Sequence, residues 1–315
     1  MLRPLPHDGS LRERLVAAYR QACLYELDAL KPGNVHRFSD GHKMTLEDFV
    51  TSADVSAEPL TRPGLGLGER IFRAVEATRD AVGCNTNLGI LMLCAPLVHG
   101  LLETPEDDTT PLRERLRAVL NQADEKETEW LFRAIELASP GGLGESDRYD
   151  VRQPAGVPLV EAMRHAVERD LIARQYATGF ADLFDYALPR LRECEQRWSS
   201  EPWALTGLYL DLLAHFPDTH IRRKHGLYKA VVISLHAASL AQGLRNAGKP
   251  EHYQLRLLQA DAEFKREGIN PGTSADMTVA TVFLAHLASM LPAFEQKTGY
   301  SRARDIRPDG VGIRS

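Results

Sequence analysis

The 315-residue sequence predicts an all-α protein, a single multi-helix globular domain over residues 1–315 whose site is built from inter-helix loops. Apolar residues recur at helical spacing along most of the chain. Capping boxes open two of these segments, with Ser10 followed by Glu13 and Thr45 followed by Asp48. Alternating apolar and polar runs bounded by turn residues, which would indicate strands, are absent from the sequence.

The first two helices are predicted to begin after Ser10 and after Thr45. The same periodicity predicts further helices over residues 69–82, 87–102, 112–121, 125–138, 158–176, 179–197, 203–215, 220–246, 252–267 and 274–293. The most apolar stretch, residues 88–102, falls short of the ~20 residues that span a bilayer. We therefore expect a buried core helix there and no membrane segment.

Composition narrows the classes of partner. The net charge of −5 argues against the broad basic face that nucleic acids or anionic membranes require. The four cysteines show no paired spacing, so neither a zinc or iron–sulfur site nor a disulfide framework is indicated. The first 15 residues contain no uninterrupted apolar segment of a secretory signal. We expect a cytoplasmic protein that acts on small molecules.

Glycine, proline and polar residues concentrate in a few connections between the predicted helices. Four of them are KPGNVHRFSDGH (31–42), GCNTNLG (83–89), SPGGLGESDRYD (139–150) and GINPGTSAD (268–276). A fifth, FPDTHIRRKHG (216–226), combines an acid with a run of bases. Loops on a helical scaffold are where binding residues tend to lie.

Two of these loops lead directly into predicted helices. In residues 270–276 a Pro-Gly turn is followed by Thr273, Ser274 and Asp276 at the start of a helix, where free N–H groups suit a phosphate. Residues 83–89 place Asn85, Thr86 and Asn87 in the same position. Considered alone, each set is better explained as ordinary helix capping, and ligand binding stays open as the alternative.

Two loops are basic. Lys31, His36 and Arg37 surround a Pro-Gly turn, which helix termination explains without explaining the bases. Asp218, Arg222 and His225 are spaced to share one helix face, an arrangement that suits a carboxylate beside a phosphate clamp, although such runs are usually solvated. The standard phosphate-loop, dinucleotide-binding, zinc-protease and serine-hydrolase motifs are absent from the sequence.

Read together, these segments resemble the triphosphoribosyl-dephospho-coenzyme A synthase family. The resemblance runs in order through LDALKPGNVHRFSDGH, SADVSAEPL, AVGCNTNLGILMLCAPL, GLGESDRYDV, ERDLIARQYATGF, FPDTHIRRKHG and NPGTSADMTVATVFLA. It implies an all-α fold, ATP binding and attack at ribose C1′ with adenine leaving. The acceptor in the named family is the ribose 2′-hydroxyl of dephospho-coenzyme A. The matching positions are Lys31, Pro32, Gly33, Val35, Asn85, Thr86, Gly89, Asp218, Gly272, Ser274, Ala275 and Asp276.

This sequence departs from the lyase-linked members at two points. It reads PGNVHR where they resemble PGLVD, and Asn85-Thr86-Asn87-Leu88-Gly89 where they have N-T-H-K-G. Both departures are similar to an archaeal and methylotroph branch, so the acceptor stays open.

The resemblance and the loop chemistry together predict roles in a transfer with an oxocarbenium-like transition state. Asp218 and Asp276 are the candidate Mg²⁺ ligands or general base, and His36 or His225 is the candidate proton donor. The candidate phosphate clamps are Lys31, Arg37, Arg222, Arg223 and Lys224. The remaining candidate ATP-binding residues are Gly33, Asn34, Asn85, Thr86, Asn87, Gly272 and Ser274.

Three alternatives remain at this point. The acceptor can be a ribityl or other sugar-alcohol hydroxyl of a pterin-type C1-coenzyme precursor. It can also be water, which would make the protein a hydrolase. A non-catalytic nucleotide-binding helical protein is the third, and a homodimer formed through a surface such as residues 220–246 is compatible with each of them.

Overall fold

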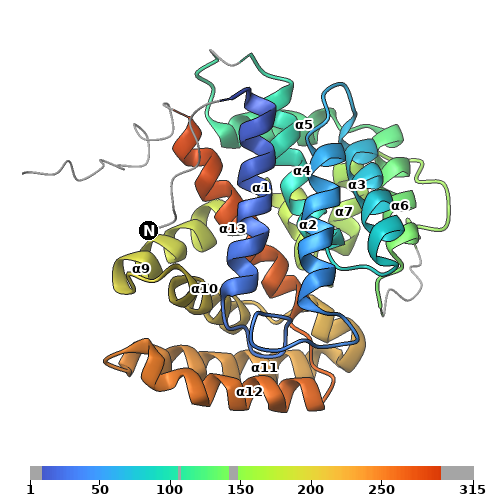
Figure 1. Cartoon of the computed structure of the whole chain (residues 1–315). Helices are drawn as coiled ribbons and strands as arrows, with labels where there is room; N and C mark the ends of the chain where they lie inside the picture. Colours follow the sequence, from blue (N-terminus) through green and yellow to red (C-terminus); the bar gives the residue numbers. More distant parts are fainter. Residues whose placement is uncertain (1–8, 106–107, 142–147, 292–315) are drawn as a thin grey trace, which may run out of the picture.

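The computed structural model describes residues 9–105, 108–141 and 148–291, and these residues contain α-helices and no strand (Figure 1). The helices are α1 Leu11–Asp28, α2 Leu46–Leu60, α3 Leu67–Val82, α4 Leu88–Leu102, α5 Leu112–Gln122, α6 Glu125–Ala138, α7 Leu159–Ala166, α8 Leu171–Thr178, α9 Leu188–Arg197, α10 Glu201–His215, α11 Thr219–Asn246, α12 Gln254–Arg266 and α13 Gly272–Met290. The all-α prediction is confirmed, and both predicted capping boxes are present.

Two predicted helices differ from the observed ones. The helix expected over residues 158–176 is two helices, because Asp170 accepts hydrogen bonds from the N–H groups of Ile172 and Ala173 and so begins α8 anew. The helix expected over residues 179–197 opens with a π-helical turn, Asp182–Ala187, before α9. As predicted, α4 is a buried core helix, and no helix of the described residues has the length and apolarity to span a bilayer.

The helices form one large core with a smaller one beneath it. In Figure 1, α1, α2 and α3 stand side by side, with α4 and α13 packed behind them. The helix α13 is buried along nearly its whole length. The smaller core joins α10, α11 and α12, and α11 and α12 cross the lower end of the molecule, directly under the turn that follows α1. This arrangement brings the loops at that end into contact with α11, α12 and α13.

Two of the predicted loops dock against each other there. Gly33 has a φ of +87°, and an added Cβ would lie 2.9 Å from Pro271 Cδ and 3.0 Å from the Ile269 carbonyl oxygen. Its N–H donates to Asp261 Oδ1 at 2.9 Å. Beside it, Asn34 Nδ2 donates to Asn270 Oδ1 at 2.8 Å. The close approach and the left-handed backbone both require glycine at this turn.

Candidate active site

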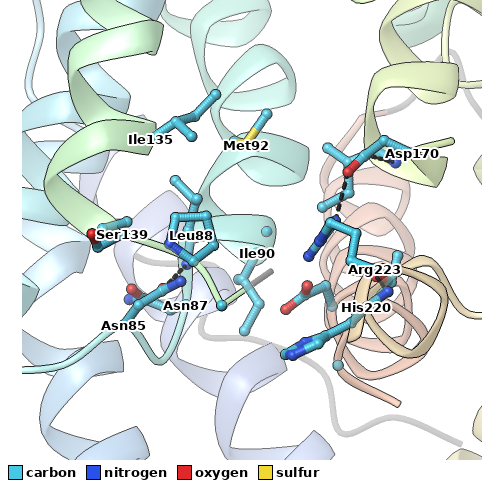
Figure 2. Close-up of a pocket in the computed structure, with 18 of the residues that line it drawn as sticks. Asn85, Asn87, Leu88, Ile90, Met92, Ile135, Ser139, Asp170, His220 and Arg223 are labelled. Carbon is cyan, nitrogen blue, oxygen red and sulfur yellow. Dashed lines mark hydrogen bonds and ion pairs between the residues drawn. The ribbon is translucent and has the colours of Figure 1, made fainter. Parts of the chain in front are cut away.

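A cleft of about 550 Å³ opens where the first turns of α4, α8, α11 and α13 meet. Figure 2 shows Asn85, Asn87 and Leu88 on one side of it and Asp170, His220 and Arg223 on the other. The volume lies within the range typical of small-molecule sites, roughly 300–1,000 Å³. Several helix N-termini converge on this cavity, and the positive ends of their dipoles favour an anionic ligand.

The structure brings half of the predicted site residues to this cleft. Those lining it are Asn34, Asn85, Thr86, Asn87, Arg223, Lys224, Gly272 and Asp276. Those outside its lining are Lys31, Gly33, His36, Arg37, Asp218, Arg222, His225 and Ser274. The predicted loop 139–150 also reaches the cleft, but its residues 142–147 lie outside the described part of the chain.

The turn before α4 is held by a buried polar network. Asn85 Oδ1 accepts the Leu88 N–H at 3.1 Å, and Thr86 Oγ1 lies 2.5 Å from Ser52 Oγ. Asn87 Nδ2 donates to Ser56 Oγ at 3.2 Å and to Thr78 Oγ1 at 3.1 Å. Both hydrogens of the Asn87 amide are therefore used within the protein, and its carbonyl oxygen remains as an acceptor for a ligand.

Asp276 lies in the first turn of α13 and faces the cleft. Within the described residues its carboxyl group takes part in no hydrogen bond or ion pair. Burial raises the pKa of Asp276 well above its usual value, and the negative charges of Asp218 and Glu26 raise it further. The raised pKa favours the neutral form of the group, which is able to donate a proton.

Gly89 in α4 makes room for this carboxyl group. A Cβ at position 89 would lie 2.1 Å from Asp276 Oδ2 and 2.9 Å from Ile172 Cδ1. The glycine that the family resemblance singled out therefore has a steric role: it allows α4 and α13 to bring their first turns together.

Gly89→Ala is expected to lower activity about 10²-fold, because the new methyl group displaces the Asp276 carboxyl, and misplacement by ~1 Å can cost that much. Gly100→Ala in the same helix is the matched control, since its Cβ would meet its nearest neighbours at 3.5 Å, an ordinary contact. Steady-state rates and thermal unfolding of the two variants provide the check. Equal activities of the two variants would contradict the steric role of Gly89.

Asp218 is fully buried and serves as the N-cap of α11. Its Oδ1 accepts the N–H groups of His220 at 2.9 Å and Ile221 at 3.1 Å. Its Oδ2 accepts both the N–H and the hydroxyl of Ser274, each at 2.8 Å. Asp218 therefore ties the start of α11 to the start of α13, and its oxygens are occupied.

The predicted common face of Asp218, Arg222 and His225 is wrong. Asp218 folds over the first turn toward α13, because it caps the helix instead of lying within it. Arg222 donates to the Glu168 carbonyl, and His225 Nε2 lies 3.2 Å from the Gly268 carbonyl oxygen. The three side chains point to different neighbours.

The basic side of the cleft is formed by the first turns of α11. Arg223 Nη1 donates to Asp170 Oδ2 at 2.8 Å (Figure 2), and Lys224 is exposed at the rim. His220 is mostly buried and neutral, since burial lowers its pKa to about 3 and Lys224 and Arg223 add to the effect. Its Nε2 has no hydrogen-bond partner among the described residues. A Cβ on Gly272 would lie 2.6 Å from His220 Nδ1, so only glycine at position 272 leaves room for the imidazole ring in this position.

The other predicted basic residues bind within the protein. Lys31 is fully buried and its ammonium contacts the Glu26 carboxylate. Arg37 pairs with Asp28 at 3.1 Å on the surface. His36 is buried, with Nε2 3.4 Å from Asp261 Oδ1. These three basic residues therefore do not line the cleft, although Asn34 and His42 of the same loop do.

Several residues of the cleft and its support were missed from the sequence. They are Glu26, Asp170, His220, Asp261 and Asn270. Glu26 had a signal, because it follows Ala22 by four residues on the buried face of α1. His220 stands in the basic run. Asn270 stands in the loop 268–276 that the sequence analysis singled out, whereas the roles of Asp170 and Asp261 depend on contacts between distant segments.

The predicted Mg²⁺ ligands Asp218 and Asp276 lie at the starts of α11 and α13. Both oxygens of Asp218 accept hydrogen bonds, whereas the Asp276 carboxyl has no hydrogen-bond partner among the described residues. In the described ranges no group of three or more His, Cys, Asp or Glu side chains is arranged to hold a metal ion. Of the carboxyl groups at the cleft, Asp170 is already paired with Arg223.

Comparison with known proteins gives consistent matches. A sequence model of the ATP:dephospho-CoA triphosphoribosyl transferase family matches residues 12–293. A protein of Pectobacterium carotovorum is 31% identical over 110 residues, covering 35% of this chain and 34% of the relative. One of Photobacterium profundum is 29% identical over 120 residues, covering 38% and 37%. Both are provisionally named 2-(5″-triphosphoribosyl)-3′-dephosphocoenzyme-A synthases, and the matches span about a third of their length.

A solved structure shares the fold. It is a protein of Archaeoglobus fulgidus provisionally assigned as a triphosphoribosyl-dephospho-CoA synthase, with a TM-score of 0.51 and 25% identity. The match covers 76% of this chain and 94% of that one.

Proposed function

The chain belongs to the ATP:dephospho-CoA triphosphoribosyl transferase family, and on that basis we propose that it transfers the 5-triphosphoribosyl group of ATP to a hydroxyl acceptor and releases adenine. The observation that carries the proposal is the Asp276 carboxyl, which has no partner among the described residues and lies in a cleft that also presents helix N-termini, Arg223 and Lys224. Such a cleft combines an anion site with a proton donor, which are the two functions this transfer needs.

The triphosphate binds at the junction of α11 and α13. There the cations Arg223 and Lys224 meet the first turn of α13, which has no side-chain cap from its own N-cap residue. The cleft lining holds five Arg and Lys residues against four Asp and Glu, although the whole chain carries a net charge of −5. Charge-assisted hydrogen bonds from these groups hold the phosphates. Burial lowers the pKa of His220 to about 3, and the N–H of its neutral ring can donate to a phosphate oxygen.

The chemical step breaks the bond between C1′ and the adenine nitrogen. The bonding electrons leave with adenine, which takes a proton from Asp276, while positive charge develops on the ribose as in glycoside cleavage. The acceptor oxygen then forms the new bond to C1′ and loses its proton. A carboxylic acid kept neutral by its surroundings suits the first proton transfer at physiological pH.

Arg223→Gln is expected to raise the KM for ATP about tenfold, the value of one charge-assisted contact of ~1.5 kcal/mol, with a smaller effect on kcat. Arg222→Gln is the matched control: it removes the neighbouring guanidinium, which does not line the cleft. Initial rates against ATP concentration distinguish them. Equal KM values for the two variants would argue against Arg223 as a phosphate ligand.

We propose that Mg²⁺ enters as part of the substrate, bound to the phosphate oxygens that a hard cation prefers, since both oxygens of Asp218 already accept hydrogen bonds within the protein. Chelation by EDTA is expected to abolish adenine release, and added Mg²⁺ in excess of ATP to restore it. Full activity in EDTA would remove Mg²⁺ from the proposal.

The acceptor is the part of the proposal that the cleft constrains least. Dephospho-CoA is the acceptor in the family description. Asn87 and Leu88 replace the histidine and lysine of the lyase-linked pattern, and neither adds positive charge to the cleft. That substitution favours a less anionic acceptor, and we propose a ribityl or other sugar-alcohol hydroxyl as the second candidate.

Chromatography of free adenine from ATP incubated with each acceptor tests the function and ranks the acceptors. Adenine that appears only with one acceptor supports transfer to it. Adenine without an acceptor would indicate a hydrolase, and thermal stabilisation by ATP without adenine would indicate a non-catalytic nucleotide-binding protein.

The setting of the enzyme is also a proposal. We place it in the cytoplasm, in line with four free cysteines, as a single domain whose cleft draws on helices from α1 to α13. A homodimer through α11 is compatible with its exposed apolar side chains Leu227, Tyr228 and Leu235. Sedimentation of the full chain tests that assembly.

A further inference from the structure

Glu26 is a buried acid at the end of α1 that the proposed step has not yet used. Its side chain is almost fully buried, 3% exposed, and still lines the cleft. One carboxylate oxygen, Oε1, contacts the Lys31 ammonium. Within the described residues Oε2 receives no hydrogen bond, so it is available to a bound molecule.

Lys31 accounts for the charge state of this acid. Its ammonium is fully buried and contacts only Glu26 and Asn34 Oδ1, the latter at 3.3 Å, among the described residues. Burial raises the pKa of Glu26, and the neighbouring Lys31 opposes that rise. A buried ion pair of this kind is weak evidence for stability, because desolvation of the two charges offsets their attraction. Its presence at the cleft points instead to a functional use.

Asp276 differs from Glu26 in its surroundings. It faces the same cleft and the negative charge of Glu26 contributes to its raised pKa, yet no cation is paired with it among the described residues. The Glu26 carboxyl is therefore paired with the Lys31 ammonium, and the Asp276 carboxyl is paired with no cation among the described residues. Two carboxyl groups whose surroundings differ in this way divide into a base and an acid.

We propose that Glu26 is the catalytic base that takes the proton of the acceptor hydroxyl, and that Lys31 is the positioning residue that holds Glu26 in its carboxylate form. This inference rests on the proposed function. In the step, the C1′–N bond breaks and adenine takes the proton of Asp276. The acceptor O–H gives its proton to Glu26, and the acceptor oxygen forms the new bond to C1′. Glu26 then loses its new proton to water and Asp276 takes up a proton from water, which restores the starting state.

The test compares Glu26→Gln, Lys31→Met and the double variant, using the full chain, ATP and the acceptor that gives most adenine with the wild type. Glu26→Gln is expected to lower kcat about 10²–10⁴-fold, the contribution of a positioned base, with the KM for ATP changed only a few-fold. Because this variant leaves the Lys31 charge unpaired, thermal unfolding is measured beside it. The double variant removes both charges and is expected to recover thermal stability without recovering activity.

Two further readouts separate catalysis from structure. Lys31→Met is expected to move the acidic limb of the rate–pH profile to higher pH, since Glu26 loses the cation that favours its ionised form, and Lys31→Arg is expected to move it back. Formate is expected to restore part of the activity of Glu26→Ala by occupying the vacated space as an external base.

Several outcomes would overturn the inference. One is a double variant that regains activity along with stability, and another is a Glu26→Gln variant with the kcat of the wild type. Recovery of Glu26→Gln by raised Mg²⁺ would make Glu26 a metal ligand instead. A wild type that releases no adenine with any acceptor would overturn the proposed function itself, so the two failures are distinguishable.

Discussion

Asp276→Asn is expected to lower kcat about 10²–10⁴-fold while the protein remains folded, because the amide keeps the shape of the neutral acid but has no proton to give to adenine. The free carboxyl and its raised pKa are the basis for this expectation. Single-turnover measurement of adenine release provides the check. Asp185→Asn is the control, since Asp185 lies away from the cleft and pairs with Arg113 at the surface.

The difference in stability between the wild type and Asp276→Asn is expected to depend on pH. A carboxyl whose pKa is higher in the folded state than in the unfolded state stabilises the fold fully below its unfolded pKa, here about 3.8. That contribution is lost as pH rises through the folded pKa. Asp276→Asn removes it, so the wild type should lose stability relative to the variant between about pH 4 and neutrality. A variant with wild-type turnover would contradict the acid role.

Asp218→Ala is expected to lower the free energy of unfolding by about 2–4 kcal/mol, which combines the loss of a helix cap with buried N–H groups left without acceptors. The affected groups are the N–H groups of His220, Ile221 and Ser274 and the Ser274 hydroxyl. Urea unfolding gives the value. Ser10→Ala, which removes the exposed cap of α1, is the control and should cost about 1 kcal/mol.

This variant also separates the two acids that the sequence had paired. Loss of activity in Asp218→Ala should accompany loss of stability, because His220 is positioned through the same cap. A variant that is as stable as the wild type but inactive would show that Asp218 acts in the chemistry.

The sequence predicted the all-α fold for local reasons, and two of the loops that it singled out line the candidate cleft. Two kinds of short-range signal predicted the helices: the capping boxes at Ser10 and Thr45, and the spacing of apolar residues. The structure contains both capping boxes. The turn before α4 and the start of α13 also carried their signal locally, in small polar residues that precede apolar helices. These two segments do line the cleft.

The division of roles among charged residues could not be predicted in the same way. Lys31 and Asp276 were both predicted to be site residues, yet Lys31 is paired inside the protein and Asp276 faces the cleft. That outcome depends on Glu26 and Gly89, which meet them only through packing between helices. The sequence patterns used here extend over a few residues and contain no information on such contacts.

The central claim is tested most directly by ATP labelled with ¹⁴C in adenine and ³²P in the γ-phosphate, incubated with the enzyme and its best acceptor. The account predicts ¹⁴C in free adenine and ³²P in the modified acceptor, in equal amounts, with neither product formed by Asp276→Asn at a comparable rate. Label of both kinds remaining on nucleotide, or ¹⁴C appearing in ADP, would contradict transfer of the intact triphosphoribosyl group.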